Sequence, residues 1–336
     1  MPYHIPVLKN ETIDALNIKE GKIYLDGTMG GGGHSEEILK KNALLIGVDR
    51  DIDAINECKN RFNKTQYDGN YIIIKDNFKN IKSIFDDKDL LINKTLNQNN
   101  DNTKIPKINS VLIQKIENGQ KPISGAMLDL GFSSHQIDEP SRGMSFRFDA
   151  PLDMRMDTSS PLTAEQVINE YPTDQLIKIL FEYGDEKFAR KIISNINRVR
   201  QSKRIETTAQ LSDIVKSSIP KKFKNEAYPE KKVFQAIRIE VNSELEGLEK
   251  SIYDIFDLIE SGGRLCIISF HSLEHRIVKK VFADLTADCV CDKSLPVCVC
   301  NHKKRAIAFK KVPPSAAELK ENSKSASATL RYIEKI

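Results

Sequence analysis

The sequence predicts an α/β protein built on an open, largely parallel sheet, and three observations support this prediction. A short apolar run at 22–25 leads into a glycine-rich turn, residues 26–35, and helical spacing begins at its end. Two further apolar runs, at 43–48 and 71–74, each end in polar residues. Strands that alternate with helices in this way form parallel sheets, which bind ligands at the carboxyl ends of the strands.

The glycine-rich turn indicates a nucleoside site, because glycines allow a tight turn and a close approach of the ligand to the backbone. Asp49 follows the glycines by about twenty residues, the spacing at which a carboxylate binds ribose hydroxyls. The first strand ends in Asp26. Its carboxylate would repel the pyrophosphate of NAD and attract the amino group of S-adenosylmethionine. The turn therefore favours S-adenosylmethionine, with an NAD-dependent oxidoreductase as the alternative.

Two later segments continue the sheet. Residues 126–130 fit a fourth parallel strand, with Asp129 near its carboxyl end as either a ligand contact or a turn cap. The apolar run 264–270 fits another buried strand. His271 follows it directly and belongs either to the ligand site or to the cap of the next helix, with Ser272 as N-cap.

Four helical patterns follow one another without an intervening strand, which predicts a helical subdomain inserted into the sheet domain. They span residues 163–170, 173–183, 185–201 and 207–217. We expect 1–138 and 231–336 to form the two parts of the sheet domain and 139–230 to form the insertion. Its basic residues form either a phosphate-binding surface or a solvated helix face. They include Arg190, Lys191, Arg198, Arg200, Lys203 and Arg204.

A polar stretch at about 86–121 interrupts the sheet domain. It is rich in Asn, Lys and Asp, and such a composition buries too little apolar surface to order itself. We expect a flexible surface insertion that acts as a spacer, or alternatively as a loop that contacts RNA.

Two C-x-C pairs near the carboxyl terminus predict a structural zinc site. Cys289, Cys291, Cys298 and Cys300 would bring four thiolates together on the arms of a short hairpin, and His302 is a possible replacement for one of them. Four reduced thiols without metal are the alternative, since zinc knuckles more often use C-x-x-C.

Bulk composition limits the class of protein. The chain has 336 residues, of which 40% are hydrophobic, which is enough for a large core. It contains no apolar run of about eighteen residues that could span a membrane. The amino-terminal residues lack the pattern of a signal peptide, so we expect a cytoplasmic protein without a membrane partner. A net charge of +4 does not by itself establish a nucleic-acid partner.

Blocks of residues along the chain carry a family resemblance. They are His4-x-Pro6-Val7-Leu8, Asp26-Gly27-Thr28-x-Gly30-x-Gly32-Gly33-His34-Ser35, Asp49-Arg50-Asp51, Asp129-Leu130-Gly131-x-Ser133-Ser134-x-Gln136-x-Asp138, Arg142-Gly143-x-Ser145-Phe146, Pro151-Leu152-Asp153-Met154-Arg155-Met156, Phe234-Gln235-Ala236-x-Arg238-x-x-Val241-Asn242-x-Glu244-Leu245 and Ser269-Phe270-His271-Ser272-Leu273-Glu274. Over nearly its whole length the chain resembles the RsmH (MraW) family of small-subunit ribosomal RNA cytosine-N4 methyltransferases.

The resemblance implies a class I (Rossmann-like) methyltransferase sheet and S-adenosylmethionine as cofactor. It also implies a substrate cytidine in the decoding centre of 16S-type rRNA, within the assembled small ribosomal subunit. Carried over by position, it assigns the following residues to the cofactor site: Gly32, Gly33, His34, Asp49, Phe78, Asp129 and Gln136.

Methylation of the exocyclic N4 of cytosine needs a group that orients this nitrogen and accepts its proton. Amino-methyltransferases commonly place a proline-rich motif after the fourth strand, but residues 129–134 lack proline. We therefore expect backbone carbonyls with Ser133 or Ser134 to orient N4, and His271 to lie close to the base. A non-catalytic rRNA-binding or assembly module that keeps the pocket for stability is the alternative from another class.

Overall fold

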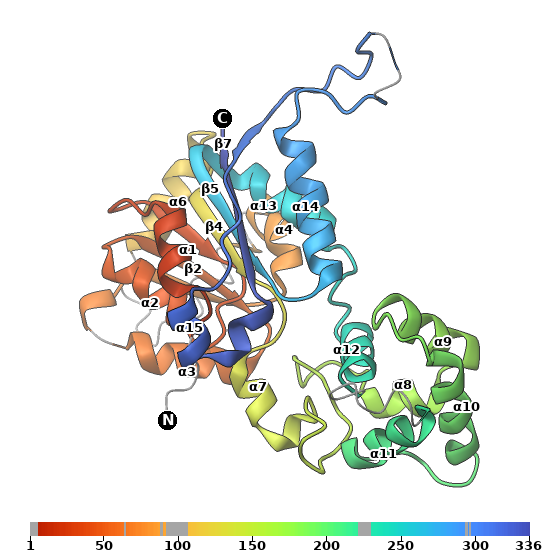
Figure 1. Cartoon of the computed structure of the whole chain (residues 1–336). Helices are drawn as coiled ribbons and strands as arrows, with labels where there is room; N and C mark the ends of the chain where they lie inside the picture. Colours follow the sequence, from red (N-terminus) through yellow and green to blue (C-terminus); the bar gives the residue numbers. More distant parts are fainter. Residues whose placement is uncertain are drawn as a thin grey trace. The chain divides into compact units, whose positions relative to one another are not determined.

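The chain forms two compact units. The computed structural model describes residues 6–63, 65–87, 90–91, 107–220, 230–292, 295 and 297–336, without the side chains of Thr65 and Ser134. One unit combines residues 1–131 with 247–336, and the other comprises 132–246. The sheet lies entirely in the first unit (Figure 1).

The sheet has seven strands in the order β3-β2-β1-β4-β5-β7-β6. The strands are β1 (Ile23–Asp26), β2 (Leu44–Asp49), β3 (Tyr71–Lys75), β4 (Ile123–Asp129), β5 (Ile259–Ser269), β6 (Ala306–Ala308) and β7 (Thr329–Lys335). Strands β1 to β5 are parallel, whereas β7 runs antiparallel to β5 and to β6. The chain order reverses between β1 and β4, which creates the switch point at which such sheets bind ligands. This topology confirms the predicted class I methyltransferase sheet.

Helices cover both faces of the sheet, which explains why its central strands are continuous apolar runs rather than alternating ones. The helices of this unit are α1 (Lys9–Leu16), α2 (Gly33–Lys40), α3 (Ile52–Phe62), α4 (Ile81–Asp86), α6 (Lys107–Glu117), α13 (Leu248–Leu258), α14 (Ser272–Thr286) and α15 (Ala316–Glu321). Tyr24, Leu45 and Met127 share one core with buried residues of α1, α2 and α3. Helix α13 packs against α4 and α14.

The second unit is helical in its described residues. It contains α7 (Ser134–Asp138), α8 (Ala164–Glu170), α9 (Thr173–Glu182), α10 (Ala189–Arg200), α11 (Thr208–Ser218) and α12 (Glu230–Val241). Thr163 and Thr207 close capping boxes at the starts of α8 and α11. The helices bury an apolar core of their own, so the insertion is a second unit rather than an extended arm.

The unit boundaries differ from the predicted ones. The helical unit spans 132–246 rather than 139–230, because Val233, Phe234 and Ile237 of α12 belong to its core. A further difference lies in the polar stretch that the sequence predicts to be flexible. That prediction is wrong for α6, where Ile108 and Leu112 are buried. Residues 88–89 and 92–106 of the stretch lie outside the described residues.

A strap, residues 142–156, is held to the rest of the second unit by polar contacts. The Arg142 guanidinium donates to the carbonyls of Arg155 and Met156 at 3.1 and 2.7 Å. The Asn242 amide oxygen accepts from the Met156 N–H at 2.7 Å, and its amide nitrogen donates to the Met154 carbonyl at 2.7 Å. Arg142 and Asn242 lie in the blocks that carry the family resemblance. Their side chains nevertheless hold the backbone of this unit.

Among the helices of the described residues, no segment has both the length and the apolar character needed to cross a membrane.

Gly143→Ala should strongly destabilise the second unit. Gly143 has φ +62°, and a Cβ there would lie 2.1 Å from the Pro151 carbonyl oxygen, which is backbone and cannot move aside. We expect a loss of at least about 3 kcal/mol in unfolding free energy by chemical denaturation. Gly119→Ala is the matched control, since it has φ +67° but nothing within 4 Å, and should lose only about 1 kcal/mol. Equal losses in both variants would show that the strap does not constrain this position.

Candidate active site

The predicted cofactor residues of the first unit come together at the carboxyl edge of the sheet. Strand β1 ends at Asp26, and the turn that follows leads into α2. Gly32 is the N-cap of α2 with φ 75°, a left-handed conformation that favours glycine. A Cβ on Gly32 would lie 2.8 Å from the Cys58 Sγ and 2.9 Å from the Phe62 ring. Conformation and space both require glycine at this position.

Gly33 and His34 hold the amino-terminal segment against this turn. A Cβ on Gly33 would lie 2.1 Å from the Pro6 ring, so the segment passes directly over it. The His34 Nε2 lies 3.0 Å from the Val7 carbonyl oxygen, and the imidazole is buried. The side chain of His34 is thus a structural tie, whereas the backbone of these residues forms the first turn of α2. Helix N-termini stabilise anionic groups such as a carboxylate.

Asp26 fastens the end of β1 to the start of α2. Its Oδ2 accepts a hydrogen bond from the Ser35 hydroxyl at 2.6 Å, and its Oδ1 accepts one from the Thr28 N–H at 3.2 Å. Burial raises the pKa of Asp26 to about 6, although the hydrogen bonds from Ser35 and Thr28 lower it. A bound cationic group would offset the burial of this carboxylate.

Asp49, at the end of β2, reaches the same turn. Its Oδ2 accepts from the Gly30 N–H at 2.7 Å and its Oδ1 from the Asp51 N–H at 2.8 Å. Burial raises the pKa of this carboxyl group. Each carboxylate oxygen has a second lone pair, so Asp49 can also accept hydrogen bonds from the hydroxyls of a ribose.

Asp129, at the end of β4, carries an uncompensated oxygen. Its Oδ1 is buried and has no hydrogen-bond partner among the described residues, while its N–H donates to the Thr28 hydroxyl at 2.6 Å. Burial, reinforced by the charges of Asp26 and Glu274, raises the pKa of Asp129 well above its usual value. A buried carboxyl oxygen without a partner is unfavourable, and a ligand that donates to it would remove this penalty.

Phe78 supplies an aromatic surface beside the turn. It begins the short 3-10 helix η2 (Phe78–Asn80) directly after β3, and Asn77 caps that helix through its side chain. A Cβ on Gly27 would lie 3.2 Å from the Phe78 Cβ, so glycine at 27 allows Phe78 to approach the end of β1. The half-buried ring is suited to the face of a nucleoside base.

His271 and Glu274 stand at the carboxyl end of β5. His271 is the N-cap of α14, whereas the helix-cap alternative from the sequence assigned the N-cap to Ser272. Its Nε2 lies 3.2 Å from the Glu274 Oε1, while the Glu274 Oε2 accepts from the Phe270 N–H at 2.8 Å. Both ring nitrogens of His271 are buried, and neither has a hydrogen-bond partner among the described residues, although Nε2 faces the Glu274 carboxylate. His271 is therefore both a helix cap and a side chain with an uncompensated polar atom at the edge of the sheet.

Gln136 and Ser133 belong to the second unit, where they form the capping box of α7. The Ser133 hydroxyl accepts from the Gln136 N–H at 3.2 Å, and the Gln136 Oε1 accepts from the Ser133 N–H at 3.0 Å. The Ser134 side chain lies outside the described ones. The structure thus brings six of the seven predicted cofactor residues together in one unit and gives Gln136 a local capping role.

Sequence reasoning missed three polar residues of the site, namely Thr28, Ser35 and Glu274. Each of them bonds a predicted site residue or the backbone beside it. A signal existed for Glu274, since a glutamate three residues after an N-cap is the capping-box pattern. Ser35 bonds the Asp26 carboxylate across the glycine-rich turn, and Thr28 accepts from the N–H of Asp129 on β4, a strand that only the folded sheet brings close.

Comparison with known proteins identifies the family of this chain. The model of the MraW methylase family matches residues 1–336. Ribosomal RNA small subunit methyltransferase H of Finegoldia magna is 43% identical over 339 residues, which cover 99% of this chain and 98% of the relative. The protein of the same name from Clostridium botulinum strain Kyoto is 45% identical over 338 residues, 99% of both chains. The family match spans the whole length, so the chain belongs to the MraW methylase family.

Proposed function

We propose that this protein uses S-adenosylmethionine to methylate N4 of a cytidine in small-subunit ribosomal RNA, within the decoding centre of the small subunit. The observation that carries the proposal is the buried, unpartnered Oδ1 of Asp129 at the switch point of the sheet. An oxygen of this kind fits the amino group of the cofactor. Family membership and the names of the relatives support the reaction and the rRNA substrate.

The residues present fit S-adenosylmethionine, which supplies a methyl group on a positively charged sulfur when it is bound. Asp49 would accept from its ribose hydroxyls, and Phe78 would cover its adenine. Asp129, together with Asp26, would face its ammonium group, and the first turn of α2 would face its carboxylate. The buried acids disfavour NAD as the cofactor, because their negative charge would repel its pyrophosphate.

His271 is the best-placed acceptor for the proton that leaves N4. The Glu274 carboxylate beside its Nε2 favours the tautomer that carries the proton there, which leaves a lone pair on Nδ1. Nδ1 is buried and has no hydrogen-bond partner among the described residues, so its lone pair is available to accept a proton from the substrate. Ser133 has a structural duty at α7, so we assign it no chemical role.

The proposal is tested by methyl transfer from labelled S-adenosylmethionine to small ribosomal subunits that lack the modification, with nucleoside analysis of the product. We expect label in N4-methylcytidine. Measurable cofactor binding without any label would overturn the proposed reaction and favour the alternative, a non-catalytic assembly module.

His271→Ala should abolish most of the transfer while cofactor affinity stays unchanged, because the imidazole acts on the base rather than on the cofactor. We expect a fall in single-turnover rate of about 100-fold or more, the typical contribution of general base catalysis. Glu274→Gln should give a smaller fall, since it only positions the imidazole. A His271→Ala variant that methylates at the normal rate would remove this residue from the mechanism.

Asp129→Asn should weaken cofactor binding without destabilising the cofactor-free protein. The amide removes the charge that faces the ammonium group, so we expect at least about a tenfold increase in Kd by titration calorimetry, or about 1.4 kcal/mol. Thermal unfolding of the cofactor-free protein should be unchanged or improved, because a buried carboxylate without a partner is no longer present. Glu117→Gln, an exposed acid on α6, is the control and should change neither quantity.

Cofactor affinity should fall as the pH decreases through about 6, the pKa to which burial raises Asp26. Below that pH the carboxyl is neutral and loses its attraction for the ammonium group. The titration of Asp26 should change the stability of the cofactor-free protein in the opposite direction, so that stability rises as the pH falls. Its folded pKa lies above its unfolded value, so the folded state binds more protons and gains stability as the pH falls from about 6 toward 4. Asp26→Asn should flatten both dependences; an unchanged pH profile in this variant would refute the assignment.

A further inference from the structure

The segment that joins α14 to β6, residues 287–305, extends away from the sheet as a loop beyond the end of α14 (Figure 1). We call it the cysteine loop. It is fixed at its base, where the Arg305 N–H donates to the Leu285 carbonyl at 2.9 Å. The His302 Nε2 lies 2.9 Å from the Asp284 carbonyl oxygen. His302 therefore ties the loop to α14.

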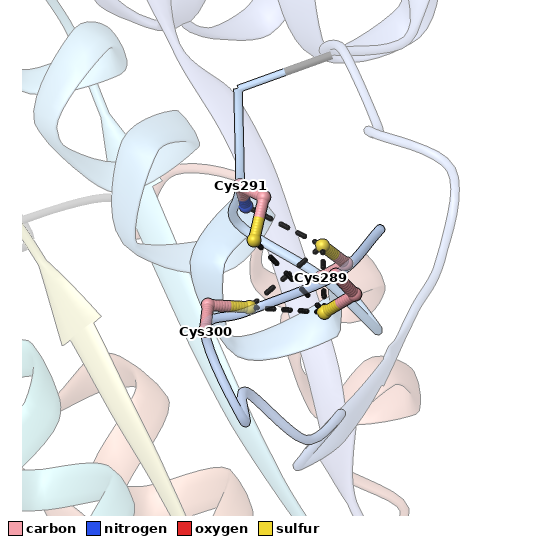
Figure 2. A group of neighbouring side chains, drawn as sticks. Cys289, Cys291 and Cys300 are labelled. Atoms are coloured by element: carbon pink, nitrogen blue, oxygen red, sulfur yellow. Dashed lines mark hydrogen bonds between the residues drawn. The ribbon is translucent and has the colours of Figure 1, made fainter. Parts of the chain in front are cut away.

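Four sulfur atoms meet in this loop. Figure 2 shows the side chains of Cys289, Cys291 and Cys300 directed toward a common centre, and the Sγ atoms of these residues and Cys298 all lie within 4.8 Å of one another. The Cys298 Sγ lies 3.4 Å from that of Cys289, 3.9 Å from that of Cys291 and 3.6 Å from that of Cys300. The Cys289 and Cys300 sulfurs are 3.7 Å apart.

These separations are those of a tetrahedral metal site. Zinc–sulfur bonds of about 2.3 Å arranged tetrahedrally place the sulfurs about 3.8 Å from one another. A disulfide would need about 2.05 Å between two of them, and all six cysteines of the chain are free thiols. An iron–sulfur cluster divides its thiolates among several irons, so it does not draw four sulfurs around one centre.

Backbone N–H groups point at the sulfurs, as they do around metal-bound thiolates. The Cys291 N–H donates to the Cys289 Sγ at 3.4 Å, and the Val299 N–H donates to the Cys291 Sγ at 3.3 Å. These donors stabilise negative charge on sulfur, and a dication bound at the centre would compensate the charge that remains.

We propose that Cys289, Cys291, Cys298 and Cys300 bind one zinc ion, and that the ion has a structural role. Four protein thiolates fill a tetrahedral shell and leave no position for substrate. His302, which the sequence offers as a replacement ligand, bonds to α14 instead. Six residues separate the two C-x-C pairs, enough for the chain to turn back around the ion.

The loop needs such an ion because it has little apolar core of its own. Val297 and Val299 are 70% and 72% exposed, and Val290 is 50% exposed. A segment that cannot bury its apolar side chains gains its folding free energy from a metal or from disulfides. The ion lies far from the candidate active site, because α14 has 15 residues and separates His271 from the loop by about 22 Å.

The test is metal analysis of the full chain, purified without chelator and without an affinity tag that binds metal. We expect about one zinc ion per chain by mass spectrometry of the metal, released when an organomercurial modifies the thiols. Cobalt(II) reconstitution should show sulfur-to-metal charge-transfer bands with the visible spectrum of a tetrahedral ion. The double variant Cys298→Ser/Cys300→Ser should lose the metal, while Val297→Ala and Cys266→Ala, controls in the loop and in the core, should keep it.

Circular dichroism and the affinity for S-adenosylmethionine show whether the double variant is folded, and we expect both to be unchanged. Trypsin should cleave the double variant faster after the exposed Lys303 and Lys304, because the loop loses its cross-link. Full-length protein that holds no metal and does not bind cobalt(II) through thiolates would overturn the proposal. Iron in place of zinc, or zinc retained by the double variant, would also overturn it.

Discussion

The burial of carboxyl groups at one edge of the sheet is the constraint on which the site depends. Asp26, Asp49 and Asp129 end three adjacent parallel strands, and burial is the largest cause of the raised pKa of each. Water no longer solvates these groups, so hydrogen bonds must hold them or a ligand must pair with them. Asp26 and Asp49 are held by backbone N–H groups of the turn, whereas the Oδ1 of Asp129 has no hydrogen-bond partner among the described residues.

The glycine-rich turn and the acids depend on each other. The Gly30 N–H donates to Asp49, and the Thr28 hydroxyl accepts from the Asp129 N–H, so the turn connects β1 to both of its neighbours. The contacts of the turn with Asp49 and Asp129 therefore shape the candidate cofactor site and also hold the ends of the three strands together. A substitution of Asp49 would change the turn as well as any contact with ribose, and only Asp129 separates the two effects cleanly.

The sequence predicted the sheet because its strands are buried on both faces, which produces continuous apolar runs that end in polar residues. It also placed Asp49 at the end of the second strand beside the glycine turn, since the distance from turn to acid is fixed by one strand–helix–strand unit. It missed α6, whose buried Ile108 and Leu112 lie within an otherwise polar composition. The capping role of Ser133 and Gln136 and the tie from His34 to Val7 depend on contacts that spacing does not specify.

A family resemblance does not distinguish residues that bind or react with a ligand from residues that stabilise the fold, and the second unit shows why. Arg142 and Asn242 lie in blocks as recognisable as those around Asp129, yet their side chains bond backbone carbonyls and N–H groups within the unit. Arg238 pairs with Glu244 and covers the Phe132 ring at 3.9 Å. These bonds within the unit identify Arg142, Asn242 and Arg238 as structural. At the carboxyl edge of the sheet, Asp129 Oδ1 and the ring nitrogens of His271 are buried without a hydrogen-bond partner among the described residues, which is why we propose ligand-binding roles for these two side chains.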